Sequence, residues 1–181
     1  MKGFNKAEKG ALSFFRFFIC ISLVCFIILT FFAFQRVSVI SVLDKDGFET
    51  YVFAFKKGDE FAIRFTHSWN RTPIDEIYRI GESGLELQET FFEDFGAGVY
   101  SNEEPGQKME LIGNKIRISS INRPVPNLTY RVGQVIANHS IIIHEKETPL
   151  SLFVSPGEPI QFKLKNVHRW RLWRDFIIWR I

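Results

Sequence analysis

The sequence predicts a mainly β protein, an antiparallel sandwich or partly open barrel of about eight to ten strands that follows a single amino-terminal transmembrane helix. Three observations lead to this prediction. An uncharged apolar stretch runs from Phe17 to Phe34. After it, short strand-like runs separated by turn signals recur about every 8–15 residues. No stretch of the domain that follows, before the carboxyl-terminal tail, keeps the 3.6-residue period of an amphipathic helix.

The apolar stretch is long enough to cross a membrane as a helix. Its 18 residues would span about 27 Å at 1.5 Å per residue, close to the hydrocarbon thickness of about 30 Å. The stretch extends to Ala11 if the Arg16 side chain reaches the headgroups. A cleaved signal peptide is the alternative, but residues 31–34 place bulky phenylalanines where cleavage requires small side chains. We therefore expect an uncleaved anchor in residues 1–35.

The charges that flank the apolar stretch predict its orientation. Residues 1–35 carry a net charge of +3, and all of that charge precedes the stretch. The positive-inside rule then keeps the short amino terminus in the cytoplasm and places the rest of the chain outside it. We expect a single-pass protein of the bacterial inner (cytoplasmic) membrane, with its carboxyl-terminal domain outside the cytoplasm.

The composition of residues 36–181 excludes several classes of function. Basic and acidic residues are equally numerous there, so the pI of about 8.9 does not indicate a nucleic-acid-binding face. Both cysteines, Cys20 and Cys25, lie in the apolar stretch, which excludes thiolate chemistry and cysteine-ligated zinc from the exported domain. The glycines of Phe95–Gly98 precede neither a helix nor a lysine, which argues against a nucleotide loop. No cofactor is predicted.

Alternating apolar residues predict the strands of a domain over residues 36–167. The runs Tyr51–Phe55 and Phe61–Phe65 flank a turn-like segment, so we expect them to form a hairpin. Turn signals such as Gly81–Gly84 separate the later runs. The expected strands are Val37–Val42, Tyr51–Phe55, Phe61–Phe65, Glu76–Ile80, Leu85–Phe91, Lys115–Ile121, Thr129–Val135, Ser140–His144, Leu150–Val154 and Ile160–Leu164.

The carboxyl-terminal tail, residues 168–181, combines arginines with tryptophans. From residue 163 to residue 181 the net charge is +5. Arginine and tryptophan together are typical of membrane interfaces and of aromatic-rich protein contacts. The alternative is a last strand or helix that closes the β domain, which the alternation in Phe162–Leu164 favours. The docking candidates in the tail are Trp170, Trp173, Trp179, Arg171 and Arg174.

The densest polar cluster, residues 65–76, lies between two predicted strands. Loops held by a rigid sheet are the usual place for binding groups, and we expect this loop to join paired strands. His67 could act as a base or a metal ligand, and Arg71 could clamp a carboxylate. The structural alternative is that Thr72-Pro73 starts a turn while Ser68 or Asn70 satisfies backbone groups.

The remaining histidines give no metal-binding or catalytic pattern. His139 and His144 flank one predicted strand, and their odd separation puts them on opposite faces. No strong metal-ligand spacing is present, so no metal is predicted. A hydrolase that uses His67 with Asp75 or Glu76 is the least favoured hypothesis, because the sequence offers no identifiable nucleophile.

Three motifs occur in the order found in a known protein family: His67-Ser68 followed by Pro73 and Glu76, then Thr90-Phe91-Phe92 running into Phe95-Gly96-Ala97-Gly98, and finally Arg131-Val132-Gly133 followed by His139. From Val37 to His144 the chain resembles this bacterial domain-of-unknown-function family, whose genes commonly lie beside those of TAXI-type TRAP transporters. The family has no established activity.

This resemblance implies a membrane-anchored accessory role in carboxylate or amino-acid uptake, by docking on the transporter's membrane subunit or its substrate-binding protein. The alternative is a small module that binds or senses an organic anion, with His67, Arg71 and Arg131 converging on it and aromatic residues of Phe91–Phe95 as walls. We expect no enzyme activity. The candidate binding residues are His67, Ser68, Asn70, Arg71, Thr72, Glu76, Gly96, Gly98, Arg131 and His139.

Overall fold

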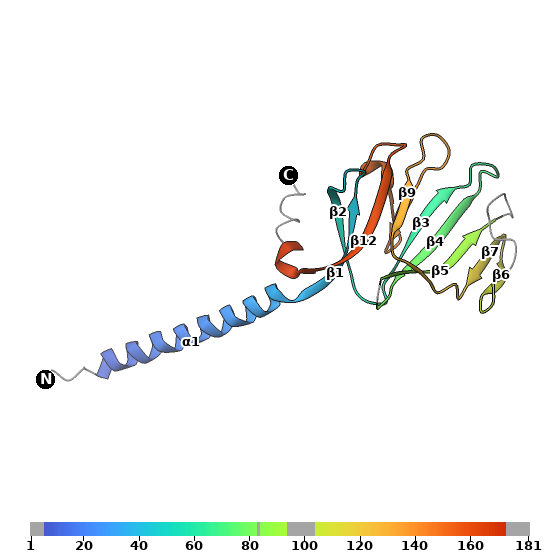
Figure 1. The fold of residues 1–181 in the computed structure, drawn as a ribbon. Helices are drawn as coiled ribbons and strands as arrows, with labels where there is room; N and C mark the ends of the chain where they lie inside the picture. The colour runs from blue at the N-terminus through green and yellow to red at the C-terminus, as the bar shows by residue number, and fades with distance from the viewer. Residues whose placement is uncertain (1–5, 83, 94–103, 173–181) are drawn as a thin grey trace. The chain divides into compact units, whose positions relative to one another are not determined.

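The chain begins with a long helix and continues into two antiparallel β-sheets (Figure 1). The computed structural model describes residues 6–82, 84–93 and 104–172. The chain forms two compact units, Ser38–Asn166 and a second unit that combines Met1–Val37 with Val167–Ile181. This mainly β structure with one amino-terminal helix confirms the predicted fold class.

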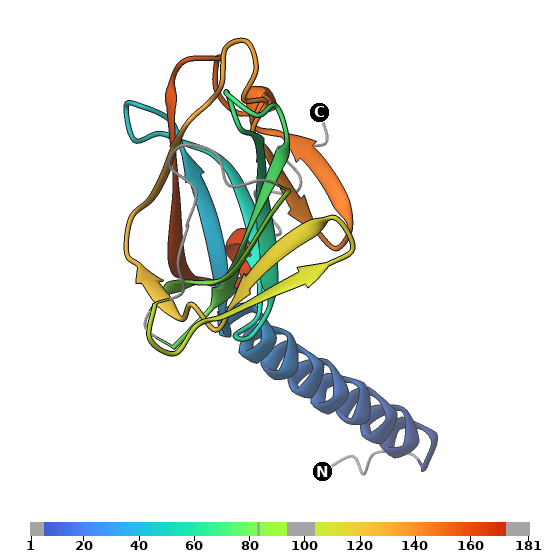
Figure 2. The same ribbon diagram turned by 90° about the vertical axis from the view of Figure 1, so that its right-hand side faces the viewer.

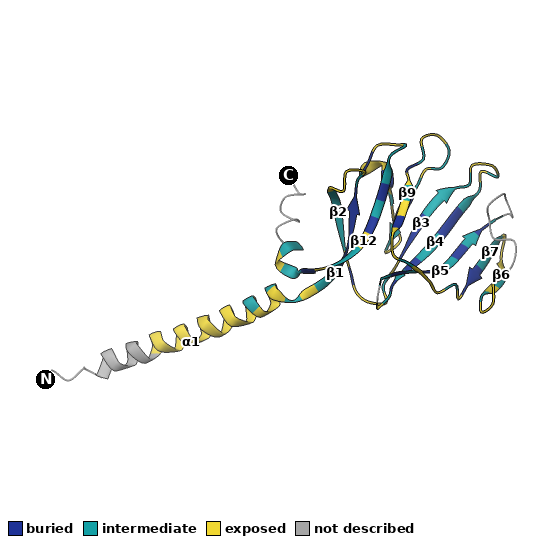
Figure 3. Ribbon diagram, in the orientation of Figure 1, coloured by how far each residue is buried: buried dark blue, intermediate teal, exposed yellow. Residues whose placement is uncertain are grey.

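Helix α1 (Lys6–Phe34) contains the predicted apolar stretch. The helical segment of 21 residues from Phe14 to Phe34 is about 31 Å long, and it is long and apolar enough to cross a membrane. Most of the apolar side chains of these residues are exposed, as the yellow helix of Figure 3 shows. Exposed apolar side chains around a whole helix are expected where lipid covers them.

The smaller sheet has four strands in the order β2-β1-β12-β9. Figure 2 shows β1 and β12, near the two ends of the chain, running side by side. The bounds of these strands are β1 (Arg36–Leu43), β2 (Glu49–Phe55), β9 (Leu128–Arg131) and β12 (Pro159–His168).

The larger sheet has eight strands. Its order is β11-β10-β3-β4-β5-β7-β6, and β8 pairs with β5. The bounds are β3 (Glu60–Thr66), β4 (Pro73–Ile80), β5 (Leu85–Phe92), β6 (Lys108–Ile112), β7 (Lys115–Ser119), β8 (Arg123–Val125), β10 (Ser140–Ile143) and β11 (Lys146–Pro149), followed by the 3-10 turn η1 (Leu150–Leu152).

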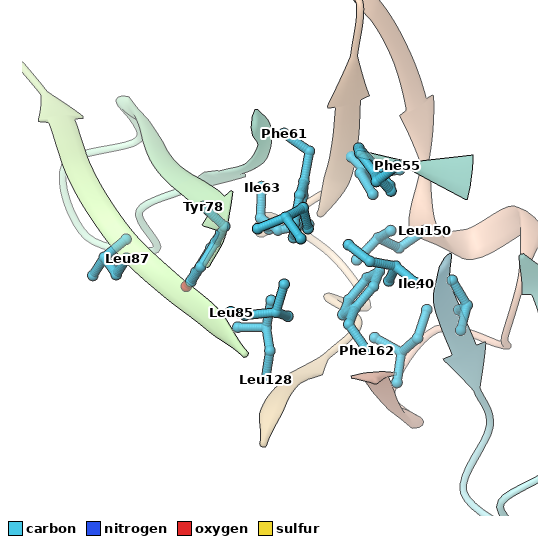
Figure 4. Packing of buried hydrophobic residues seen from close by; sticks show 14 of the residues in the cluster. Ile40, Phe55, Phe61, Ile63, Tyr78, Leu85, Leu87, Leu128, Leu150 and Phe162 are labelled. Atoms are coloured by element: carbon cyan, nitrogen blue, oxygen red, sulfur yellow. The ribbon is translucent and has the colours of Figure 1, made fainter. Parts of the chain in front are cut away.

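The core lies between the two sheets, which makes the domain a sandwich. Ile40 and Phe162 from the small sheet are almost fully buried together with Ile63 and Leu87 from the large sheet, and Figure 4 shows such side chains pointing toward one another. Each large apolar side chain buried here contributes roughly 1.5–3 kcal/mol. A smaller cluster of Ile74, Phe92 and Ile118 covers the β4–β5–β7 part of the large sheet.

The predicted hairpin of Tyr51–Phe55 and Phe61–Phe65 is wrong, because these strands belong to different sheets. β2 pairs with β1, whereas β3 pairs with β4 and β10. Phe55 and Phe61 are both almost fully buried, with ring centroids 5.7 Å apart, so the turn between them carries the chain across the core. The Gly58 amide donates to the carbonyl oxygen of Ile80, which ties this turn to β4 (2.9 Å).

The run Leu150–Val154 begins with the 3-10 turn η1 and contains no strand, contrary to the prediction. In a strand, Leu150 and Leu152 would lie on the same face and be similarly buried. Instead, Leu150 is fully buried and Leu152 is 72% exposed. The run predicted from Thr129 ends early, at Arg131, and the run predicted from Ile160 continues to His168. Strands β6, β8 and β11 were not predicted.

Candidate functional site

The β3–β4 loop, residues 67–72, is a turn closed by its own hydrogen bonds. The His67 amide donates to the Thr72 carbonyl oxygen (2.9 Å), and the Arg71 amide donates to the His67 carbonyl oxygen (2.9 Å). The His67 Nδ1 atom accepts a further bond from the Asn70 amide (3.3 Å). The loop joins two paired antiparallel strands, as predicted.

The same loop directs several side chains outward. Ser68 and Arg71 are exposed, and Trp69 exposes 82% of its surface. Arg71 has a left-handed backbone (φ 57°), which is uncommon for a residue with a Cβ and marks a tight turn. The hydrogen bonds thus fix the backbone of a loop whose tryptophan side chain lies in solvent.

A second polar group lies on the inner face of the large sheet. Glu76 and Tyr78 are two residues apart on β4 and therefore share a face. The Tyr78 hydroxyl donates to Glu76 Oε2 (2.8 Å), and the hydroxyl of Tyr130, from β9 of the other sheet, donates to the same oxygen. The two phenol oxygens are 2.7 Å apart. The Glu76 carboxylate is thus held by side chains of both sheets.

The two phenols remain protonated donors. Burial is the main cause that raises the pKa of Tyr78 and of Tyr130, and the charge of Glu76 raises both further. Each phenol has one proton, so Tyr130 can donate to Glu76 while Tyr78 donates to either of the other two groups. A carboxylate bound in this way is stabilised by charge-assisted hydrogen bonds.

Thr90 on β5 lies directly across from Glu76. Its side chain is 3% exposed, and its Oγ1 atom has no hydrogen-bond partner among the described residues. Thr90 belongs to the second family-like motif of the sequence. The inner face at Glu76 therefore carries an additional buried polar atom.

His139 lies beside Tyr130, in the segment between β9 and β10. Its ring is stacked on Phe65, with centroids 5.4 Å apart, and is 5.5 Å from the Tyr130 ring. The Nδ1 atom accepts a hydrogen bond from the Gly133 amide (3.1 Å), so this nitrogen is unprotonated. Burial lowers the pKa of His139, against the opposing effects of a backbone hydrogen bond at Ala137 and the charge of Glu76. The imidazole is therefore neutral at neutral pH.

The Arg-x-Gly motif shapes the backbone around His139. A Cβ at Gly133 would lie 1.8 Å from the Ala137 carbonyl oxygen, so only glycine fits at this position. Arg131 Nη1 donates to the Gly157 carbonyl oxygen (2.8 Å), and the Gly157 amide donates to the Val132 carbonyl oxygen (2.7 Å). The motif thus ties the end of β9 to the turn before β12.

A depression of about 240 Å³ lies beside His139. Its walls combine one cation, one amide side chain and one imidazole with backbone atoms of small residues. The residues that line it are Arg131, Val132, Gly133, Gln134, Ala137, His139 and Gly157.

The structure brings some of the predicted residues together. Glu76 and His139 both contact Tyr130, whereas Arg131 turns to the Gly157 carbonyl oxygen, since adjacent strand residues face opposite ways. The β3–β4 loop holds His67, Ser68, Asn70, Arg71 and Thr72.

Other candidate residues lie elsewhere in the fold or outside the described residues. Phe92, expected in a pocket wall, is fully buried in the smaller core cluster, and Phe91 lies under the Arg117 guanidinium (5.8 Å). Trp170 and Arg171 follow β12 in a short helical segment. Gly96, Gly98, Trp173, Arg174 and Trp179 lie outside the described residues. Within the described ranges no group of three His, Cys, Asp or Glu side chains could hold a metal ion.

Sequence reasoning missed the two tyrosines. Tyr78 could have been found, because it lies two residues after Glu76 on the same predicted strand and therefore on its face. Tyr130 gives no such signal, since its contact with Glu76 spans 54 positions of the chain and two sheets.

The part of the chain that holds these residues matches a known family. Residues 61–150 match the model of a family described as a domain of unknown function, DUF1850. The match agrees with the expectation of an uncharacterised domain family, although it begins later than the predicted resemblance from Val37. Neither a curated protein nor a solved structure matches the chain.

The DUF1850 match contains Glu76, Tyr78, Tyr130 and His139, and also the β3–β4 loop. It leaves out β1, β2 and β12, which form most of the small sheet. The core of the β domain in this chain therefore includes strands on both sides of the matched segment.

Proposed function

We propose that this protein is a membrane-anchored, extracytoplasmic accessory protein of a TAXI-type TRAP uptake system. Three points support this proposal: the family resemblance, the apolar helix α1 and a β domain whose most prominent polar loop carries an exposed tryptophan. The protein would act by docking on the transporter's membrane subunit or on its substrate-binding protein.

The observation that favours docking is the preformed β3–β4 loop. Tryptophan and arginine are enriched at the energetic centres of protein interfaces, and Trp69 and Arg71 are both exposed on this loop. The hydrogen bonds at His67 hold the backbone before a partner arrives. Binding to a preformed loop loses little conformational entropy, because the loop is already ordered.

The test is affinity purification of the tagged full-length protein from detergent-solubilised membranes of its host. The wild-type protein should recover transporter components, and Trp69→Ala should recover at least about tenfold less, since truncating an interface hot spot costs about 2 kcal/mol or more. Phe48→Ala is the matched control, because Phe48 is another exposed aromatic residue (71%), in the β1–β2 turn of the other sheet. Repeated failure of the wild-type protein to recover any transporter component would contradict the proposal.

A small organic-anion binding module is the second candidate function. The depression beside His139 favours it, because the side chains of Arg131 and Gln134 can bind a carboxylate. Thermal unfolding of the full-length protein with a panel of dicarboxylates and amino acids tests this function. A true ligand at 100 times its Kd should stabilise the protein by about 2.7 kcal/mol, and Arg131→Gln should abolish the shift.

A further inference from the structure

The outer end of helix α1 is capped by residues that follow β12. A helix leaves its last four carbonyl groups without helical partners, and the last turn of α1 contains no basic residue that could bind them. The His168 Nδ1 atom lies 2.9 Å from the Phe34 carbonyl oxygen, so His168 is the donor. The Arg169 amide donates to the Gln35 carbonyl oxygen (2.9 Å). We call residues His168–Leu172 the capping segment.

Aromatic contacts hold the capping segment on the helix. The His168 and Phe34 rings meet edge to face, with centroids 5.7 Å apart. The Arg169 guanidinium lies over the Phe32 ring, 5.9 Å from its centroid, at a distance typical of cation–π interactions. Two residues far along the chain therefore lie beside the last turn of α1.

The proposed membrane anchor, helix α1, determines how deep in the membrane the capping segment lies. If Phe14–Phe34 crosses the membrane, Phe34 lies at the boundary between hydrocarbon and headgroups. Phe32 is about 3 Å deeper, so the Arg169 side chain at Phe32 lies at the level where arginines reach toward headgroup phosphates. Trp170 is 42% exposed, and tryptophan is enriched at this level.

The charge at this level is entirely positive among the described residues nearby. Arg36, Arg169 and Arg171 are basic, and residues 14–37 and 167–172 contain no aspartate or glutamate. Guanidinium groups bind phosphate oxygens in a forked geometry. We propose that the capping segment binds the phosphate groups of anionic phospholipids in the outer leaflet. This inference rests on the membrane anchoring of the proposed function and does not depend on the transporter partner.

The test uses the full-length protein reconstituted in bilayers of phosphatidylcholine and phosphatidylglycerol. After mild detergent extraction, mass spectrometry measures how strongly phosphatidylglycerol is enriched among the lipids that stay bound. The wild-type protein should enrich it, and Arg169→Gln with Arg171→Gln should lower the enrichment at least about fivefold, because each arginine near an anionic surface adds to the attraction. Arg169→Lys with Arg171→Lys should keep most of it, and inorganic phosphate should not displace the lipid.

The matched control is Lys45→Gln with Lys146→Gln, which removes two charges from exposed sites of the β domain. This control variant should enrich phosphatidylglycerol as the wild type does. All of the variants should keep the melting temperature of the wild type. Equal enrichment by the Arg169/Arg171 glutamine variant would overturn the proposal, as would an absence of enrichment in the wild type. Loss of transporter recovery with unchanged lipid enrichment would also overturn it and assign the segment to protein docking. Lipid enrichment without any recovered transporter would contradict only the proposed function.

Discussion

Asp75 and Glu76 are neighbours on β4, but the sheet directs their side chains to opposite faces with different partners. On the outer face, Arg64 donates two hydrogen bonds to Asp75, from Nε to Oδ1 (2.6 Å) and from Nη2 to Oδ2 (2.8 Å). On the inner face, the hydroxyls of Tyr78 and Tyr130 bind Glu76. One carboxylate is thus paired with a cation, and the other is held by neutral donors.

The surroundings explain this difference. Arg64 also binds Glu147 of β11 across β10 (3.1 Å), so the Asp75 pair belongs to a wider set of charges on the outer face. Hydrogen bonding to Asp75 is the main cause that raises the pKa of Arg64. Glu76 lies beside the apolar core, where Tyr78 packs on Phe61 (5.5 Å). A phenol brings its own apolar ring into such a core, which a guanidinium cannot do.

The largest expected effect is the loss of the outer pair. Arg64→Met leaves Asp75, which is only 8% exposed, without its bidentate partner. Removing one partner of a buried pair costs about 3–5 kcal/mol, and because the Arg64 side chain is 36% exposed we expect about 2–4 kcal/mol of unfolding free energy. Chemical denaturation of the full-length protein in detergent measures this loss.

Arg79→Met is the matched control for Arg64→Met. Arg79 grips Glu60 across the same two strands with the same donor atoms, Nε and Nη2. Both side chains of that pair are 43% exposed, so the loss should be only about 0–1 kcal/mol. Equal losses for the two variants would show that the burial of Asp75 does not determine the strength of its pair.

The inner carboxylate should respond to the loss of a phenol by a smaller amount. Tyr130→Phe removes a hydrogen bond to a charged group and keeps the ring in the core, so we expect a loss of about 1.5–3 kcal/mol. Glu76→Gln keeps an amide oxygen that can accept from the phenol, and it should cost about 1 kcal/mol. Denaturation of both single variants and of the double variant gives their coupling energy.

Contacting groups in one network typically show coupling of about 0.5–3 kcal/mol. A coupling energy near zero would mean that the Tyr130 hydroxyl contributes to stability independently of Glu76. Tyr78→Phe combined with Tyr130→Phe extends the test, since the two phenol oxygens also contact each other (2.7 Å).

The alternating pattern made the central strands predictable. Phe61 and Ile63 on β3, and Tyr78 and Ile80 on β4, are large apolar residues at every second position, which places them on the buried face of each strand. Two of the strands that were not predicted, β8 and β11, lack this alternation. β11 (Lys146–Pro149) is mostly exposed and pairs only with β10 among the described strands, and β8 contains Pro124 and spans three residues.

Pairing between strands was harder to predict than their presence. The segment between Phe55 and Phe61 has the composition of a hairpin turn, and nothing local tells that the chain changes sheets there. The same limit applies to the site. Glu76 and His139 were predicted as candidates from separate motifs, but their shared neighbour Tyr130 follows from the packing of β9 against the large sheet.

The smallest expected effect concerns His139, and it sharpens the comparison because the His139 ring contacts Tyr130, whose hydroxyl binds Glu76. Burial lowers the pKa of His139 below its ordinary value of 6.5, so below that pH the unfolded chain takes up a proton more readily than the folded chain. The free energy of unfolding should therefore fall as the pH drops through the range below 6.5, and this contribution is fully present above it.

Denaturation between about pH 7.5 and about pH 5.5 measures the slope of unfolding free energy against pH. His139→Gln should flatten it. An unchanged slope in His139→Gln would mean that the pH dependence arises from other groups.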